Sequence, residues 1–316
     1  MTPVTARRVT TVAELRELVA RARHEGRRVG LVPTMGALHE GHLANVRLAA
    51  EVSDLVVVSI FVNPRQFDRA DDLEAYPRDL EGDEAALAAL GDAAPQVVFV
   101  PEVGEVYPGE PAVTVTVSRL TDRLCGATRP GHFDGVATVV TKLLNMVAPD
   151  VAVFGRKDFQ QLQVIRHLVR DLNLPVEIVA APTVREADGV AMSSRNRRLD
   201  AAEREAARAL PRALRETVTV ARGERAAGRP PDADLLRTAA TAILDAALGV
   251  EIDYVEVLDP ETLAPPDGTR RGEAGESASP EQLLVAVAAH VGPVRLIDNV
   301  VVGDPDDEDA LLATRD

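Results

Sequence analysis

The chain has 316 residues, a length at which two domains are the default, and 46% hydrophobic with 27% charged residues is typical of a globular protein. A formal net charge of −15 disfavours general nucleic-acid binding, because that affinity depends on basic residues that neutralise phosphates. No apolar run approaches the roughly 20 residues that span a bilayer, so we expect no membrane anchor. The single Cys125 excludes an internal disulfide framework, and with no signal-like N-terminus it favours the cytoplasm.

The hydrophobic pattern predicts an α/β arrangement in the first half of the chain. Apolar residues recur at helical spacing over 12–24, and short apolar runs at 29–32 and 55–61 are typical of strands buried on both faces of a parallel sheet. A helix-like run from His42 to about residue 54 joins these strands into a strand–helix–strand unit. Further expected elements are helices at 80–90, 136–147 and 162–172 and strands at 96–100, 113–117, 150–154 and 176–180.

The composition changes after Asp200 and predicts a small α+β domain with an antiparallel sheet. A Gly-, Glu- and Ser-rich stretch at 265–280 has no periodicity and is expected to be a flexible insertion. From Gly303 onward six carboxylates oppose one arginine, so −5 of the −15 lies in a tail that we expect to be disordered. The expected elements are helices at 200–220 and 232–248 and strands at 252–258, 283–289 and 294–302. The expected divisions are domains over 1–184 and 185–302 and an acidic tail over 303–316.

The segment Val29–Asn45 carries the strongest functional signal. Its apolar run gives way to a loop with Gly36 and Gly41 that leads into a helix, an arrangement whose free backbone N–H groups and dipole favour a bound phosphate. His39 and His42 would share one helix face if the first turn begins near His39. Imidazole can donate a hydrogen bond to a phosphoryl oxygen near neutral pH. Half of a metal site, or ordinary polar residues at a helix start, are the alternatives.

Polar residues also follow the second strand. Ligands of open α/β sheets bind outside the carboxyl ends of the strands, and the amides of Asn63 and Gln66 could orient a hydroxyl or a carboxylate there. Equally, Asn63 could simply turn the chain before Pro64. The acidic stretch 68–83 could be a solvated face or could help to place Mg²⁺. In the Gly-rich segment 125–135, Arg129 is a candidate ligand for a phosphate or carboxylate.

A later segment repeats the first design. The strand at 150–154 is followed by Gly155, a basic residue and a helix start, so Lys157 would offer a point charge to phosphate, with Gln161 one turn further along. Ser193, Ser194 and Arg195 add two hydroxyls and a guanidinium, although such a triplet is by itself most often a loop.

Five segments, in this order, resemble the pantothenate synthetase family, the pantoate–β-alanine ligases. They are Pro33–His42, Ile60–Phe67, Arg129–Phe133, Phe154–Gln161 and Met192–Asn196, and the resemblance extends to about Val302. It implies a Rossmann-like nucleotidylyltransferase domain with a parallel sheet, a smaller α+β C-terminal lid and a homodimer. It also implies that ATP and pantoate form pantoyl adenylate and pyrophosphate, after which β-alanine displaces AMP to give pantothenate.

The resemblance also implies roles for single residues. The ATP loop would be Met35, Gly36, Ala37, Leu38, His39, Glu40, Gly41 and His42, with His42 in the position of the proton donor. Gln66 and Gln161 would hold pantoate, with Gln66 also near β-alanine. The remaining ATP contacts would be Gly155, Arg156, Lys157, Asp158, Val184, Met192, Ser193, Ser194 and Arg195. Two positions depart from the family pattern: Cys125 stands where Glu is common, and Arg156 where Glu or Gln is more usual.

The residues favour this chemistry independently of the resemblance. A carboxylate that attacks the α-phosphate builds negative charge on phosphoryl oxygens, which fixed donors such as His39, His42 and Lys157 would stabilise. Mg²⁺ would bridge the phosphates, and no protein residue is assigned as a metal ligand. Two rivals are a nucleotidylyltransferase that acts on a phosphate and a nucleotide-binding regulatory protein without chemistry. Gln66 and Gln161 favour a carboxylic acid, because a phosphate acceptor would want a further basic residue there.

Overall fold

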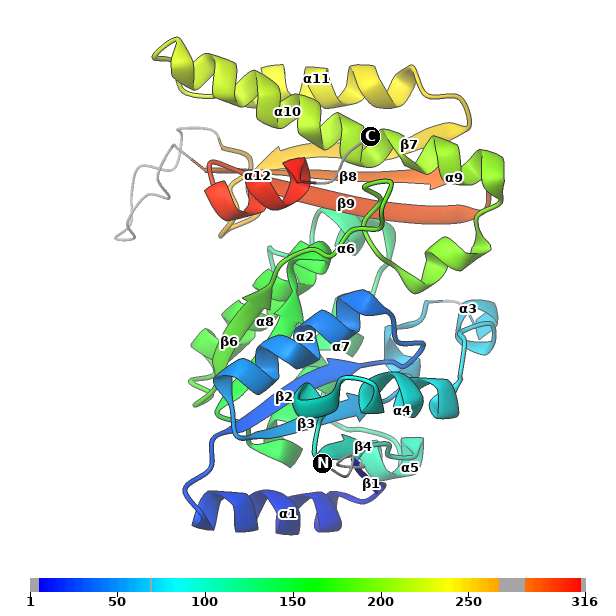
Figure 1. Cartoon of the computed structure of the whole chain (residues 1–316), viewed down its shortest axis with the longest axis vertical. Helices are drawn as coiled ribbons and strands as arrows, with labels where there is room; N and C mark the ends of the chain where they lie inside the picture. The colour runs from blue at the N-terminus through cyan, green and yellow to red at the C-terminus, as the bar shows by residue number, and fades with distance from the viewer. Residues whose placement is uncertain (1–5, 69, 267–281, 314–316) are drawn as a thin grey trace. The chain divides into compact units, whose positions relative to one another are not determined.

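The computed structural model describes residues 6–68, 70–266 and 282–313 (Figure 1). The chain divides into two compact units. Unit 1 comprises Met1–Arg156 and Gln160–Ala181, and unit 2 comprises Lys157–Phe159 and Pro182–Asp316. A short piece of chain directly after a strand of unit 1 is therefore grouped with unit 2. No helix of the described part is long and apolar enough to cross a membrane.

Unit 1 is built on a parallel sheet, as the apolar runs predicted. Its six described strands lie in the order β1-β4-β3-β2-β5-β6, and each neighbouring pair is parallel. All six residues of β3 are buried, as expected for a strand covered on both faces. The strands are β1 Arg7–Val9, β2 Val29–Thr34, β3 Leu55–Ile60, β4 Val97–Phe99, β5 Val151–Gly155 and β6 Glu177–Ala181.

The helices of unit 1 connect and cover these strands. Helix α1 begins after Thr11, whose hydroxyl accepts a hydrogen bond from the Glu14 N–H, and α2 packs along β2, β3 and β5 (Figure 1). The α-helices are α1 Val12–His24, α2 Glu40–Val52, α3 Ala70–Glu74, α4 Leu80–Ala88, α5 Val103–Val106, α6 Leu124–Thr128, α7 His132–Val147 and α8 Phe159–Asp171. Short 3₁₀ helices are η1 Pro64–Gln66, η2 Gly91–Ala93 and η3 Arg156–Asp158.

One predicted strand of unit 1 is wrong. Residues 113–117 have no regular structure, and Val113 is 74% exposed. The Val115 N–H donates to the Thr138 hydroxyl of α7 rather than to a neighbouring strand. The alternation of Val and Thr therefore reflects an extended segment held by a side chain.

The carboxyl ends of β2 and β5 lie where the strand order of the sheet reverses. From β2 the chain proceeds to β3 and β4 on one side and returns to β5 on the other side of β2. Ligands of open α/β sheets bind outside the carboxyl ends of strands at such a reversal. The histidine-bearing loop that follows β2 lies at this edge of the sheet.

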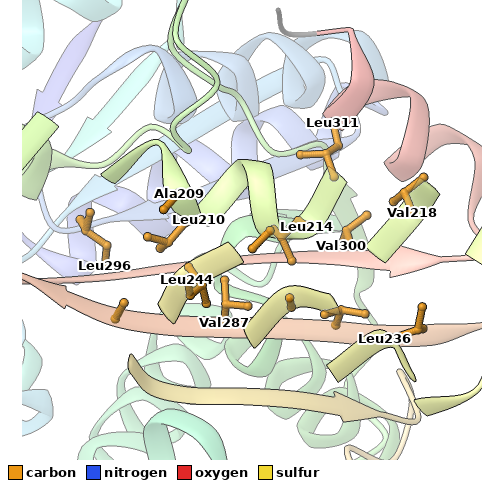
Figure 2. Packing of buried hydrophobic residues seen from close by; sticks show 14 of the residues in the cluster. Ala209, Leu210, Leu214, Val218, Leu236, Leu244, Val287, Leu296, Val300 and Leu311 are labelled. Atoms are coloured by element: carbon orange, nitrogen blue, oxygen red, sulfur yellow. The ribbon is translucent and has the colours of Figure 1, made fainter. Parts of the chain in front are cut away.

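Unit 2 is a three-stranded antiparallel sheet with the order β7-β8-β9 in the described residues. Apolar residues of α10, α11 and the sheet form one buried hydrophobic cluster. Figure 2 shows Leu214 and Leu244 among its residues. The elements are η4 Ser194–Arg198, α9 Ala201–Ala207, α10 Ala209–Ala226, α11 Ala233–Asp245, β7 Val250–Leu258, β8 Leu283–Val291, β9 Val294–Val302 and α12 Pro305–Leu312.

The prediction of a disordered acidic tail is wrong for its described part, because Pro305–Leu312 forms α12. Carboxylates in a first turn are stabilised by the helix dipole, and Asp304 caps the helix by accepting from two backbone N–H groups. The buried Asp307 accepts from the Val301 N–H at 2.7 Å, and the buried Glu308 pairs with Arg222 at 2.8 Å. The expected flexible insertion at 265–280 lies mostly outside the described residues.

Candidate functional site

The loop after β2 has an unusual backbone. Gly36 and Ala37 both adopt left-handed conformations, with φ of 80° and 51°. The Gly36 N–H donates to the Thr34 hydroxyl at 3.3 Å, and this hydroxyl donates to the Ser59 carbonyl of β3 at 2.8 Å. The left-handed conformation costs a non-glycine residue roughly 1–2 kcal/mol, so something must hold Ala37 in place.

A buried carboxylate from α4 holds the loop. Asp83 is 4% exposed, and its two oxygens accept from the Ala37 N–H at 3.0 Å and from the Leu38 N–H at 2.6 Å. A Cβ on Gly36 would lie 2.9 Å from an Asp83 oxygen, so this approach also requires glycine. The sequence reasoning had placed Asp83 in an acidic stretch that was solvated or near Mg²⁺. Its position instead makes it the anchor of the loop.

The two histidine rings lie next to each other at the start of α2. His39 is the N-cap, and its Nδ1 accepts from the Gly41 N–H at 3.2 Å. A backbone N–H can only donate, so Nδ1 carries no proton and the proton of the neutral ring lies on Nε2. The His39 and His42 ring centroids lie 4.1 Å apart with an angle of 30° between the planes. The spacing of three residues thus places both imidazoles at the positive end of one helix, as predicted.

A second group of polar side chains gathers after β3, around η1. Asn63 is 1% exposed and donates from Nδ2 to the Gln66 Oε1 at 3.1 Å and to the Gly135 carbonyl at 3.1 Å. The Gln66 Nε2 donates to the Met35 sulfur at 2.9 Å, which connects this group to the loop after β2. The Tyr107 hydroxyl donates to the Asn63 Oδ1 at 2.9 Å. The structure therefore brings together Met35, Asn63 and Gln66 from the predicted set.

Helix α7 approaches η1 so closely that a side chain at residue 135 has no room. A Cβ on Gly135 would lie 2.2 Å from the Arg65 carbonyl oxygen. Nearby, the His132 Nδ1 lies 2.8 Å from the Gln66 carbonyl oxygen, and an Arg129 nitrogen donates to the same oxygen at 3.3 Å. Arg129 therefore supports the backbone of Gln66, and its predicted role as a substrate ligand stays a prediction.

Burial and a nearby cation have opposite effects on the pKa of Tyr107. Burial raises the pKa of its phenol from 10.0 to about 12, against the opposing effect of the Arg65 cation. The Arg65 guanidinium carbon lies 5.8 Å from the ring centroid and the Lys142 Nζ lies 5.5 Å from it. A phenol with a raised pKa remains a hydrogen-bond donor throughout the neutral and mildly alkaline range.

Unit 2 contains most of the remaining predicted nucleotide contacts, whereas Gly155 and Arg156 at the end of β5 belong to unit 1. The Met192 N–H donates to the Val184 carbonyl at 2.9 Å, so these two predicted positions lie side by side. Ser193 caps η4 by accepting from the Arg195 N–H at 3.3 Å. The Lys157 carbonyl accepts from the Asn299 Nδ2 at 2.8 Å. Lys157, Ser193, Ser194 and Arg195 are all half-buried, and their role as nucleotide contacts stays a prediction.

The segment that carries these residues is held by a buried ion pair. Arg185 and Asp298 form a two-pronged contact with distances of 2.6 and 3.0 Å, and their side chains are 3% and 2% exposed. Arg185 also donates to the Gly189 carbonyl at 3.1 Å. The turn between Val184 and Met192 is therefore fixed to β9 from inside unit 2.

The sequence reasoning missed two residues of the site. Asp83 is one of many acids in the stretch 68–83, and the sequence pattern does not single out Tyr107. For Asp83 no local signal distinguishes the buried carboxylate from its exposed neighbours. For Tyr107 the only hint was that a rare aromatic residue, in a chain with 3% aromatics, follows a predicted strand.

Comparisons with known proteins agree on one family. The family model described as pantoate-beta-alanine ligase matches residues 7–301. Pantothenate synthetase from Pseudomonas aeruginosa strain UCBPP-PA14 is 51% identical over 296 residues, which cover 93% of this chain and 98% of that protein. The protein of that name from Chelativorans sp. is 52% identical over 295 residues, covering 93% and 97%.

Solved structures give the same result. The crystal structure of pantothenate synthetase from Thermus thermophilus matches with a TM-score of 0.81 at 44% identity, covering 93% of this chain and 98% of that one. Pantoate-beta-alanine ligase from Francisella tularensis, complexed with beta-gamma ATP and beta-alanine, matches with a TM-score of 0.72 at 29% identity, covering 94% and 97%. Fold, site geometry and relatives lead to one conclusion: the chain belongs to the pantoate–β-alanine ligase family.

Proposed function

We infer that the chain is an AMP-forming ligase that condenses pantoate with β-alanine to pantothenate at the expense of ATP. The family assignment over residues 7–301 supports the activity, and the Francisella tularensis relative is complexed with beta-gamma ATP and beta-alanine. The observation that carries the assignment of the site is the imidazole pair at the start of α2, beside the carboxyl end of β2. Donors in this position suit a triphosphate rather than a neutral ligand.

In the first step we propose that a pantoate carboxylate oxygen attacks the α-phosphorus of ATP. A P–O bond forms to pantoate, the bond to the pyrophosphate leaving group breaks, and negative charge grows on the phosphoryl oxygens. The His39 Nε2–H and the His42 ring would donate to these oxygens at the positive end of α2. No general base is needed, because the attacking carboxylate is already ionised at neutral pH.

In the second step the amine of β-alanine attacks the carbonyl carbon of pantoyl adenylate. The amide bond forms, the bond to the AMP oxygen breaks, and the nitrogen loses a proton. We propose that Gln66, through its Nε2, and Gln161 hold pantoate during both steps. Amides suit this role since they orient a hydroxyl or a carboxylate without adding charge. The mixed anhydride must be kept from water, because hydrolysis would waste it.

Several finer parts of the function remain proposals. Lys157, Ser193, Ser194 and Arg195 of unit 2 are proposed as further ATP ligands, and Mg²⁺ as the counterion of the phosphates. The described residues contain no group of three His, Cys, Asp or Glu side chains that could hold a metal ion. Magnesium would then take its ligands mainly from phosphates and water, as it commonly does. A homodimer in the cytoplasm is also proposed.

The test is a reconstitution with purified protein, ATP, Mg²⁺, pantoate and β-alanine, with AMP and pantothenate measured together. We expect equal amounts of both products and no AMP turnover when pantoate is omitted. A phosphate monoester in place of pantoate serves as the control for the rival nucleotidylyltransferase. Pyrophosphate release that depends on the phosphate acceptor, with the AMP moiety kept in the product, would contradict the ligase assignment. Neither AMP nor pyrophosphate under any condition would favour the regulatory protein.

A further inference from the structure

Backbone groups determine which way the hydrogen bonds run among the polar side chains around η1. The Asn63 Oδ1 accepts from the Arg65 N–H at 3.3 Å, and the Asn63 Nδ2 donates to the Gly135 carbonyl at 3.1 Å. A backbone N–H can only donate and a carbonyl can only accept, so the Asn63 amide has a single allowed orientation. Tyr107 must then donate to Oδ1, and Gln66 must present its Oε1 to Nδ2.

This orientation determines which end of Gln66 is available to a ligand. Because Asn63 donates to the Gln66 Oε1, the Gln66 Nε2 is the end of the amide that is not bonded to Asn63. Nε2 lies 2.9 Å from the Met35 sulfur, and a thioether is a weak acceptor. A ligand oxygen can displace the sulfur at small cost, because the contact that it replaces is weak.

We propose that Tyr107 is a positioning residue that, together with the Arg65 N–H and the Gly135 carbonyl, holds the Asn63 amide in place and so keeps Gln66 with Nε2 as the outward donor. The substrate group that Gln66 binds is therefore an acceptor oxygen of a carboxylate or hydroxyl, and a donor group is rejected at this position. The inference rests on the proposed role of Gln66 as a pantoate ligand. Tyr107 itself touches no substrate atom in this proposal.

Two properties suit Tyr107 to this role. It is 8% exposed, so the hydrogen bond to Asn63 is protected from competition by water. Burial also raises its pKa, so the phenol keeps its proton and donates across the pH range in which the amine of β-alanine begins to be neutral. A phenylalanine of the same shape would fill the space but would leave the Asn63 oxygen with fewer donors.

The experiment compares Tyr107→Phe with Tyr254→Phe, a matched loss of one hydroxyl from β7 in unit 2. For Tyr107→Phe we expect the KM for pantoate to rise about tenfold, the effect of one neutral hydrogen bond, with the KM for ATP changed less than about twofold. Tyr254→Phe should leave both constants unchanged. Thermal melting of each variant shows whether the fold persists, and a structural role alone would not separate the two KM values.

A second variant tests the direction of the hydrogen bonds from Tyr107 through Asn63 to Gln66. It also tests the proposal if Tyr107→Phe does not fold. Asn63→Asp keeps the acceptor for Tyr107 but offers no donor to Gln66 or to the Gly135 carbonyl, so the Gln66 amide should rotate and present Oε1, and thermal melting shows whether this variant keeps its fold. We expect the KM for pantoate to rise more than in Tyr107→Phe, again without a matching rise for ATP. Near-normal pantoate KM in a folded Tyr107→Phe, or in Asn63→Asp, would overturn the proposal. If the unmodified protein makes no pantoate-dependent AMP, the proposed function itself has failed, which is a distinguishable result.

Discussion

Asp83 gives the sharpest test of how the loop after β2 is built. Replacing it with asparagine keeps one acceptor oxygen but turns the other into an NH₂ group. One of the two loop N–H groups, of Ala37 or Leu38, then faces a donor inside the protein. A buried donor without a partner costs about 1–3 kcal/mol, and weakening the other bond from charged to neutral adds about 1 kcal/mol.

We therefore expect Asp83→Asn to lower the free energy of unfolding by about 2–4 kcal/mol. Urea denaturation followed by circular dichroism measures this difference. The matched control is Asp79→Asn on the same helix, where the side chain caps α4 by accepting from the Gly82 N–H. Asparagine caps helices about as well as aspartate, so the control should be nearly neutral. Equal stability of the two variants would refute the claim that Asp83 anchors the loop.

Three further predictions follow from the geometry. His42→Ala should slow adenylate formation by about 10²–10³-fold, the usual effect of one lost transition-state donor, as measured by pyrophosphate release in a single turnover. Asp298→Ala should destabilise the protein by about 3–5 kcal/mol, since it leaves the buried Arg185 charge without its partner, whereas Asp234→Ala at an exposed pair should cost less than about 1 kcal/mol in guanidinium denaturation. The folded protein raises the Tyr107 pKa from 10.0 to about 12, so the phenol ionises at a lower pH in the unfolded chain than in the folded one. The contribution of the Tyr107 hydroxyl to the free energy of unfolding is therefore complete below pH 10 and is lost between pH 10 and 12. We expect this loss to be on the order of 2–3 kcal/mol relative to Tyr107→Phe.

Each of these has an outcome that would count against it. Near-normal pyrophosphate release from His42→Ala would make the imidazole structural rather than catalytic. Similar losses in Asp298→Ala and Asp234→Ala would mean that burial of the ion pair has little influence. Parallel stability curves of the unmodified protein and Tyr107→Phe above pH 10 would contradict the raised pKa.

Local pattern determined much of unit 1 and the positions of its first motif. Leu55 and the three valines that follow it at the start of β3 predict a strand buried on both faces. The spacing of His39 and His42 likewise follows from helix geometry, since three residues bring side chains to the same face. These features depend on residues close together in the chain, so the sequence could specify them.

The tertiary structure decided which polar groups serve the site. Asp83 and Ala37 are 46 residues apart in the chain, and Tyr107 and Asn63 are 44 apart. Neither contact affects the local hydrophobic pattern, so the sequence alone could not predict it. The acidic tail shows the same limit, because its charges predict disorder until Asp307 and Glu308 find the N–H groups of Val301 and Gly303. A buried carboxylate or phenol is stable only with a partner, and packing alone determines where that partner lies.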